Sequence, residues 1–210
     1  MGNFNYKIED IERMFFNRAP GVMGCYSHYS VLVPLVKKDG ELNLLFEVRS
    51  PDLERQPGEV CFPGGRMEEK EDAEECAVRE TAEELGIGRS AIRVINRLDS
   101  LYTYSNSALH SFLGELDYRA LLYAEINRKE VESVFYIPLR DIVTSEPFVY
   151  KTEALLNVGD DFPYEMINAS GGYNWGKGCH DVLIYNFGDK IVWGLTARIV
   201  YNFAEIFKGS

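Results

Sequence analysis

A pair of glycines runs directly into a strongly acidic segment, and the flanking residues set the bounds of a helix there. The stretch is CFPGGRMEEKEDAEECAVRETAEELGIG, residues 61–88. Asp72 followed by Glu75 has the layout of an N-terminal capping box. Gly86 stands where a left-handed residue commonly ends a helix. The sequence therefore predicts a helix over about 72–85, held between two loops.

Carboxylates gather on one side of this helix. At about 100° per residue, Glu83, Glu80 and Glu84 fall within an arc of roughly 100°, while apolar residues fill the neighbouring arc. Like charges one turn apart, as in Glu80 and Glu84, oppose helix formation by about 0.2–0.5 kcal/mol. An exposed acidic face would explain the pattern. A divalent cation would explain it too, because Mg²⁺ and Mn²⁺ prefer oxygen ligands.

Two neighbouring features favour the cation. Arg79 could hold one carboxylate in a fixed orientation through a bidentate contact. Gly64 and Gly65 would let the backbone approach the same ion and lend a carbonyl oxygen. The segment is thus a candidate metal site built from a loop and a helix.

The rest of the chain predicts one α+β domain over residues 1–210. Asp39-Gly40 favours a tight hairpin between two strands. Apolar spacing predicts a short N-terminal helix over about 7–17 and a C-terminal helix over about 195–207. The buried side of the latter would carry Leu195, Ile199, Phe203 and Ile206. Further strands are expected at 92–98, 109–116, 131–137, 148–156 and 182–186.

Composition narrows the class of protein. The net charge of −11 argues against nucleic acid as a partner, because lysine and arginine supply the affinity for phosphate backbones. The sequence shows no apolar run long enough for a membrane span and no secretory signal pattern, so a cytoplasmic protein is expected. Its four cysteines form no CxxC pair, which argues against a zinc knuckle. They are expected to be reduced and mostly buried.

The acidic segment resembles the signature of the Nudix hydrolases, which runs from glycine through spaced acidic residues to a final glycine and an aliphatic residue. The matching positions are Gly65, Glu71, Arg79, Glu80, Glu83, Glu84, Gly86 and Ile87. Only Thr81 departs from it, at a position that is aliphatic in the family. The resemblance makes residues 65–87 a Nudix box. It implies an α/β/α sandwich with a central mixed sheet.

The resemblance also implies a metal-dependent hydrolase acting on a nucleoside diphosphate derivative, with Mg²⁺ or Mn²⁺. Glu80 and Glu84 would be the main ligands, with Glu83 and the Gly65 carbonyl completing the set. Arg79, Glu80 and Glu83 are the catalytic candidates. The general base stays open between Glu83 and a residue beyond the box, such as Glu130 or Glu115.

Upstream, LFEVRSPDLERQPGEVCFPGG resembles the second motif of the coenzyme A diphosphatase branch of the family. The positions in register are Leu45, Arg49, Ser50, Gly58, Phe62, Pro63, Gly64 and Gly65. Glu47 replaces a threonine, and Glu54 fills an arginine position with Arg55 one place later. Arg49, Arg55 and Arg66 are the candidates for binding substrate phosphates.

Three functions follow from this resemblance. The first is hydrolysis of coenzyme A or its thioesters to 3',5'-adenosine bisphosphate and 4'-phosphopantetheine. The second is hydrolysis of another substrate such as ADP-ribose or NADH, which the displaced arginine favours. The third is a non-catalytic nucleotide-binding regulator, which the complete glutamate set disfavours. A homodimer is possible for the family.

Other aromatic and imidazole side chains carry weaker signals. Tyr102, Tyr104 and Asn106 could line a ligand pocket, and Trp193 is expected to be a packing residue. The three histidines are each expected to lie outside the site.

Overall fold

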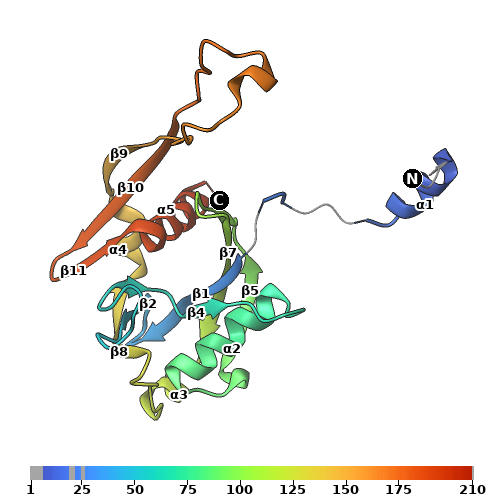
Figure 1. Cartoon of the computed structure of the whole chain (residues 1–210). Helices are drawn as coiled ribbons and strands as arrows, with labels where there is room; N and C mark the ends of the chain where they lie inside the picture. Colours follow the sequence, from blue (N-terminus) through green and yellow to red (C-terminus); the bar gives the residue numbers. More distant parts are fainter. Residues whose placement is uncertain (1–6, 19–21, 25–26, 210) are drawn as a thin grey trace.

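A long hairpin organises the structure. The computed structural model describes residues 7–18, 22–24 and 27–209. Strands β1 (Ser27–Lys38) and β2 (Glu41–Arg49) pair in antiparallel fashion. Asp39 and Gly40 join them with φ values of 52° and 84°, so the predicted tight turn is confirmed. This hairpin forms the centre of the main sheet (Figure 1).

The main sheet is mixed because β7 (Ser107–Leu116) runs parallel to β1. Strand β5 (Ile92–Arg97) pairs with β7 in the antiparallel direction. On the other side of the hairpin, β2 pairs with both β3 (Val60–Cys61) and β8 (Val131–Pro138). Two short strands complete the sheet: β4 (Gly64–Arg66) against β1 and β6 (Leu101–Tyr102) against β7.

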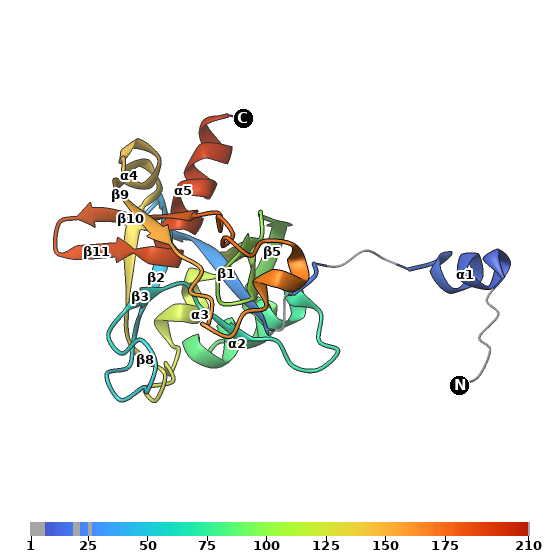
Figure 2. The ribbon, with the colours of Figure 1, turned by 45° about the horizontal axis from the view of Figure 1, so that its top comes forward.

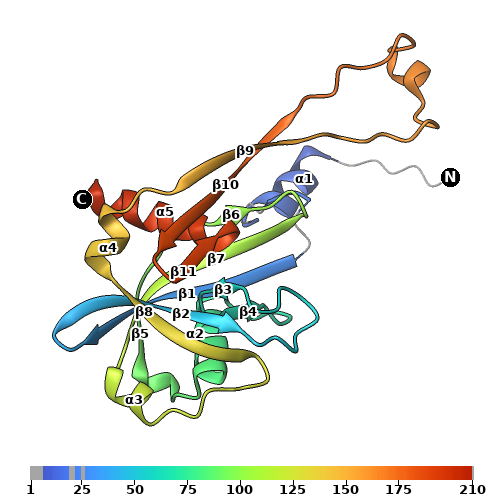
Figure 3. The same ribbon diagram turned by 90° about the vertical axis from the view of Figure 1, so that its left-hand side faces the viewer.

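Alternating residues of β1 pack into two separate hydrophobic cores. Leu32 and Val36 pack with α2 (Ala73–Leu85) on one face of the sheet. Val33 packs on the other face with α5 (Gly194–Lys208). The two helices therefore cover opposite faces, as Figures 1 and 3 show. The predicted α/β/α sandwich with a mixed sheet is confirmed.

A second, three-stranded sheet lies beside α5. Its order is β11 (Lys190–Trp193), β10 (Gly178–Phe187) and β9 (Phe148–Ala154). Strands β9 and β10 reach beyond the main sheet and carry the segment 155–177, which includes the short 3₁₀ helix Tyr164–Ile167 (Figure 3).

Several elements differ from the sequence-based expectation. The N-terminal helix α1 (Ile8–Phe15) forms as predicted but buries no residue and lies away from the sheet (Figure 2). Helix α5 buries Ile199 and Phe203 as expected, whereas Leu195 and Ile206 are exposed. Elements that were not predicted are α3 (Tyr118–Leu122), α4 (Leu139–Thr144), the 3₁₀ helices at Arg89–Ala91 and Tyr164–Ile167, and strands β3, β4, β6 and β11.

The described cysteines are all free thiols. Cys76 is buried, Cys61 is half-buried and Cys179 is exposed, so the expectation of buried thiols fails for the last of these. Cys25 lies outside the described residues. Within 7–18, 22–24 and 27–209, no helix has the length and apolarity needed to cross a bilayer.

Candidate active site

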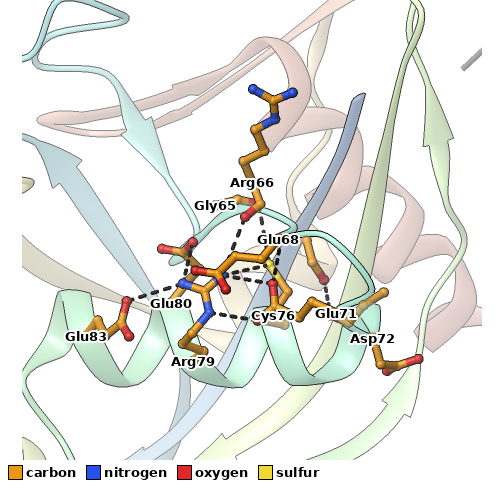
Figure 4. Close-up of polar contacts among 12 residues, drawn as sticks. Gly65, Arg66, Glu68, Glu71, Asp72, Cys76, Arg79, Glu80 and Glu83 are labelled. Atoms are coloured by element: carbon orange, nitrogen blue, oxygen red, sulfur yellow. Dashed lines mark hydrogen bonds and ion pairs between the residues drawn. The ribbon is translucent and has the colours of Figure 1, made fainter. Parts of the chain in front are cut away.

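Arg79 binds three carboxylates and ties the loop before α2 to the helix. It donates to both oxygens of Glu71, from Nε at 2.7 Å and from a terminal nitrogen at 3.0 Å. Its other terminal nitrogen donates to Glu80 at 2.8 Å and to Glu83 at 3.3 Å (Figure 4). The hydrogen bonds from Arg79 lower the pKa of Glu71 to about 2. The bidentate contact therefore falls on Glu71, and Glu80 is positioned through the same guanidinium.

Glu84 is a buried carboxylate, and Gly64 positions it. Its Oε2 accepts the backbone N–H of Gly64 at 2.8 Å. Burial raises the pKa of Glu84 to about 8, because the charged form loses its hydration and faces Glu80 and Glu130 nearby. In the absence of a cation, burial therefore favours the protonated form of this side chain.

Gly64 and Gly65 are both needed because neighbouring atoms lie where a Cβ would be. A Cβ on Gly65 would lie 2.4 Å from the carboxylate of Glu80. A Cβ on Gly64 would lie 2.2 Å from the backbone oxygen of Ser30, and Gly64 has a φ of 153°. Gly65 therefore leaves room for a side chain, whereas Gly64 leaves room for the neighbouring strand β1.

A fifth carboxylate belongs to this cluster and was missed in the sequence. Glu47 on β2 is fully buried, and its pKa is raised by burial and by the adjacent Glu84. Its Oε1 is buried without a hydrogen-bond partner among the described residues. In the sequence, Glu47 was noted only as a replacement for a threonine of the upstream motif. Pairing of Glu47 with Cys61 on β3 and Val134 on β8 places it here.

The donor set fits a divalent cation. As they stand, no three Asp, Glu, His or Cys side chains of the described segments converge closely enough to hold an ion. However, Glu84 and Glu47 bury two carboxyl groups side by side, and one oxygen is left unpaired, which is costly without a cation. Burial also raises the pKa of the nearby Cys61 and Cys76 thiols, so oxygen atoms remain the available ligands.

A cavity of about 750 Å³ lies beside this cluster. Glu80 and Glu84 line it, as does Gly65. The three arginines singled out in the sequence, Arg49, Arg55 and Arg66, also line it. All three therefore lie at the same cavity as the carboxylates, and the phosphate contacts expected of them stay a prediction.

The candidates for the general base differ in their position relative to the cavity. Glu130 lines the cavity and raises the pKa of both Glu80 and Glu84. Glu83 is not part of the lining, and its side chain is 58% exposed while bound to Arg79. Glu115 lies elsewhere, where Arg93 donates to it at 3.0 Å beside a different hollow. The suggestion of Glu115 was therefore wrong, because its strand carries it away from α2.

Arg49 lies closer to the carboxylates than the sequence indicated. Its charge lowers the pKa of both Glu47 and Glu84, opposing the effect of burial. Its Nε is buried without a hydrogen-bond partner among the described residues. Arg49 therefore faces the same space as the acidic cluster.

The C-terminal elements supply the far wall of the cavity. His180 and Val182 from β10, Trp193 from β11 and Leu195 and Ile199 from α5 all line it. Trp193 is 45% exposed, so its expected role in packing is wrong. Tyr104 lines the cavity and packs edge-on against His180, with 5.5 Å between the ring centroids. Tyr102 and Asn106 do not line the cavity. His28 and His110 stack on each other outside it.

Comparison with known proteins decides the family. The NUDIX domain profile matches residues 26–155. The chain belongs to the Nudix hydrolase family. This Nudix hydrolase is 40% identical over 193 residues to the mouse peroxisomal coenzyme A diphosphatase NUDT7, covering 87% of this chain and 76% of that protein. It is 29% identical to an uncharacterized Nudix hydrolase, NudL, of Yersinia enterocolitica, with 89% and 85% covered.

Among solved structures, this Nudix hydrolase is similar to a MutT/nudix family protein from Enterococcus faecalis. The TM-score is 0.52 at 14% identity, with 98% of this chain and 71% of that chain covered. At that identity the likeness shows the fold alone.

One residue departs from the family pattern, and the structure accounts for it. Thr81 is fully buried in this Nudix hydrolase, at a position that is aliphatic in the family pattern. Its hydroxyl donates to the backbone oxygen of Ala77 at 2.6 Å, so the polar group is satisfied within the helix. The substitution therefore leaves the packed face of α2 intact.

Proposed function

We propose that this Nudix hydrolase cleaves the diphosphate of coenzyme A or its thioesters, giving 3',5'-adenosine bisphosphate and 4'-phosphopantetheine. The observation that carries the substrate class is the 40% identity to the mouse coenzyme A diphosphatase across 87% of this chain. That similarity extends beyond the 26–155 region shared with the family at large. The arginines that line the cavity with the carboxylates supply positive charge for phosphate groups.

Glu80 and Glu84 would hold Mg²⁺ or Mn²⁺, assisted by the Gly65 carbonyl and by Glu83, which would first have to leave Arg79. The bound cation would supply charge neutralisation of the diphosphate and a lower pKa for an attacking water. Arg79 keeps Glu80 in place, and the Gly64 N–H keeps Glu84 in place. Glu130 is the stronger candidate to accept the proton of the water, because it lines the cavity and Glu83 does not.

The arginines divide by position. Arg49, beside Glu84 and Glu47, is assigned to the diphosphate itself. Arg55 and Arg66 are assigned to the 3'-phosphate of the ribose. Figure 4 shows the Arg66 side chain pointing away from α2, and this direction supports a contact with a part of the substrate remote from the diphosphate.

A substrate panel tests the proposal. Turnover of coenzyme A, its 3'-dephospho form, ADP-ribose and NADH would be measured with Mg²⁺ and with Mn²⁺. Coenzyme A is expected to be the best of the four, because the 3'-phosphate adds a contact that the others lack. Rapid hydrolysis of ADP-ribose with coenzyme A untouched would favour the second candidate, for which Glu54 at an arginine position is the motivating feature. No turnover of any compound would favour the non-catalytic regulator.

A cytoplasmic location and a homodimer both stay predictions. The peroxisomal location in the name of the mouse relative is a property of that protein. Fractionation of cells and sedimentation of the purified protein would test them.

Cation affinity is expected to rise with pH. The raised pKa of Glu84, about 8 against an ordinary 4.5, means that a proton competes with the ion below about pH 8. Between these two values the folded chain binds more protons than the unfolded chain, so metal-free stability falls as pH rises through this window. Mn²⁺ affinity measured by calorimetry should increase by up to about tenfold per pH unit from about pH 6 to 8.

The matched variant for this prediction is Glu84→Gln, which removes the titrating group. Its weaker Mn²⁺ binding should lose most of the pH dependence. An affinity that stays constant over the same range in the unaltered chain would contradict the assignment of Glu84 as a ligand.

A further inference from the structure

Glu47 is a buried acid at a position where the upstream motif carries threonine. It lies on β2, and its side chain is 1% exposed. It also lies outside residues 65–87, so the Nudix box does not account for it. Carboxyl groups are almost never fully buried unless they are paired. The presence of an acid here therefore needs a reason in the chemistry of the site.

The neighbours of Glu47 leave it incompletely paired. Its carboxyl group shares a hydrogen bond with that of Glu84, but its Oε1 has no partner within 7–18, 22–24 and 27–209. Arg49 places one positive charge near the two carboxyl groups, and Glu130 adds a further negative one. A buried oxygen without a donor costs free energy, because it has lost water and gained nothing in return.

Glu47 and Glu84 approach each other from two layers of the fold. Glu84 comes from α2 and lines the cavity, and the Gly64 N–H holds its Oε2 at 2.8 Å. Glu47 comes from the main sheet, where it pairs with Cys61 on β3 and Val134 on β8. The sheet therefore brings an unpaired oxygen directly behind a side chain that is already assigned to the cation.

We propose that Glu47 is a further oxygen ligand of the cation held by Glu80 and Glu84, contributed from the sheet side of the site. This inference rests on the proposed function. The cation would take the place of the hydrogen bond between the two buried carboxyl groups. It would also give the unpaired Oε1 of Glu47 the positive partner that it lacks in the metal-free protein.

A third acidic ligand changes the order in which cation and substrate bind. Mg²⁺ is usually held by one or two carboxylates together with water and substrate phosphates. With Glu47 added to Glu80 and Glu84, we expect the cation to bind before the substrate and to stay between turnovers. Threonine, the residue of the motif, has no anionic oxygen to offer, so this property would set the chain apart from the pattern that it resembles.

The test is Mn²⁺ binding to the substrate-free chain, measured by calorimetry in Glu47→Gln and Glu47→Thr. Glutamine keeps the size of the side chain and can donate to Glu84, whereas threonine restores the residue of the motif. Both variants should raise the Kd for Mn²⁺ about ten- to a hundredfold, the loss typical when groups that support a metal site are removed. Metal-free Glu47→Gln should unfold at the same temperature as the unaltered chain or above it, because a buried acid has been removed.

Glu59→Gln is the matched control. Glu59 lines the same cavity, but its carboxylate accepts Nε2 of Gln56 at 3.0 Å and is not hydrogen-bonded to the acidic cluster. It removes one negative charge from the cavity, and its Kd for Mn²⁺ should stay within about twofold of the unaltered value. A loss as large as that in Glu47→Gln would overturn the proposal, because the total charge would then account for the affinity.

Two other results would overturn the role of Glu47. One is an unchanged Kd for Mn²⁺ in Glu47→Gln. The other is a clearly lower unfolding temperature of the metal-free variant, because lost affinity would then follow from a damaged fold. Glu84→Gln separates this failure from that of the proposed function. If Glu84→Gln weakens Mn²⁺ binding and the Glu47 variants do not, only the role of Glu47 is wrong. If none of them weakens it, the metal-dependent function is wrong as well.

Discussion

Replacing either Glu80 or Glu84 with glutamine is expected to cut turnover at least about a hundredfold, the scale of comparable electrostatic deletions. Glutamine keeps the size of the side chain but cannot supply an anionic oxygen to a cation. Glu84→Gln also removes a carboxyl group whose pKa burial has raised, so the metal-free fold should tolerate it. Steady-state kinetics and Mn²⁺ affinity would be measured together.

The control is Glu75→Gln on the same helix, whose side chain is exposed near the N-terminal end of α2. It removes the same charge without touching the cavity, and its turnover should stay within about twofold of the unaltered enzyme, since surface substitutions have small effects. Rates close to the unaltered enzyme in both Glu80→Gln and Glu84→Gln would refute the metal assignment.

Replacing Gly65 with alanine is expected to lower turnover, whereas replacing Gly64 with alanine is expected to lower stability. At Gly65 the three atoms nearest to the new Cβ all belong to the Glu80 carboxylate, the end of a flexible side chain that can move aside. Gly65→Ala should therefore lose at least about tenfold in turnover, through misplacement of Glu80, while unfolding changes little. At Gly64 the new Cβ meets the backbone of Ser30 and Val31, and φ is 153°. Gly64→Ala should lower the free energy of unfolding by about 2–6 kcal/mol.

Denaturant unfolding and kinetics on both variants separate the two effects. Gly176→Ala is the control, because a Cβ there would have no neighbour within 4 Å and no positive φ is involved. A stable Gly64→Ala protein would show that strand β4 can move away from β1. An unaffected turnover in Gly65→Ala would show that the position of Glu80 is not critical.

Local signals in the sequence were sufficient for the hairpin, for α2 and for the placing of Glu80 and Glu84 on one side of that helix. A turn dipeptide, a helix cap and a C-terminal glycine each act within a few residues, and all three hold in the structure: Asp72 caps α2 by accepting the N–H of Glu74, and Gly86 ends it with a φ of 65°. The spacing of Glu80 and Glu84 placed both at the same cavity for the same local reason.

Features that depend on distant pairing were not predictable in this way. Glu47 was noted in the sequence only as a replacement for a threonine, and the neighbouring strands β3 and β8 place it beside Glu84. Trp193 looked like a core residue, since exposure at the cavity depends on how β11 and α5 lie against β3. Helices α3 and α4, with five and six residues, are too short to show a helical period.

The hydrogen bond from Thr196 to Val60 joins helix α5 to strand β3 of the main sheet at the edge of the cavity. Glu80 and Glu84, the proposed metal ligands, come from the α2 layer, and the apolar wall of the cavity comes from the α5 layer. A molecule that fills the cavity would touch both layers at once and act as a non-covalent cross-link between them. Ligand binding and the attachment of the two layers to each other are therefore thermodynamically linked. A ligand that binds only the folded chain stabilises that chain against unfolding.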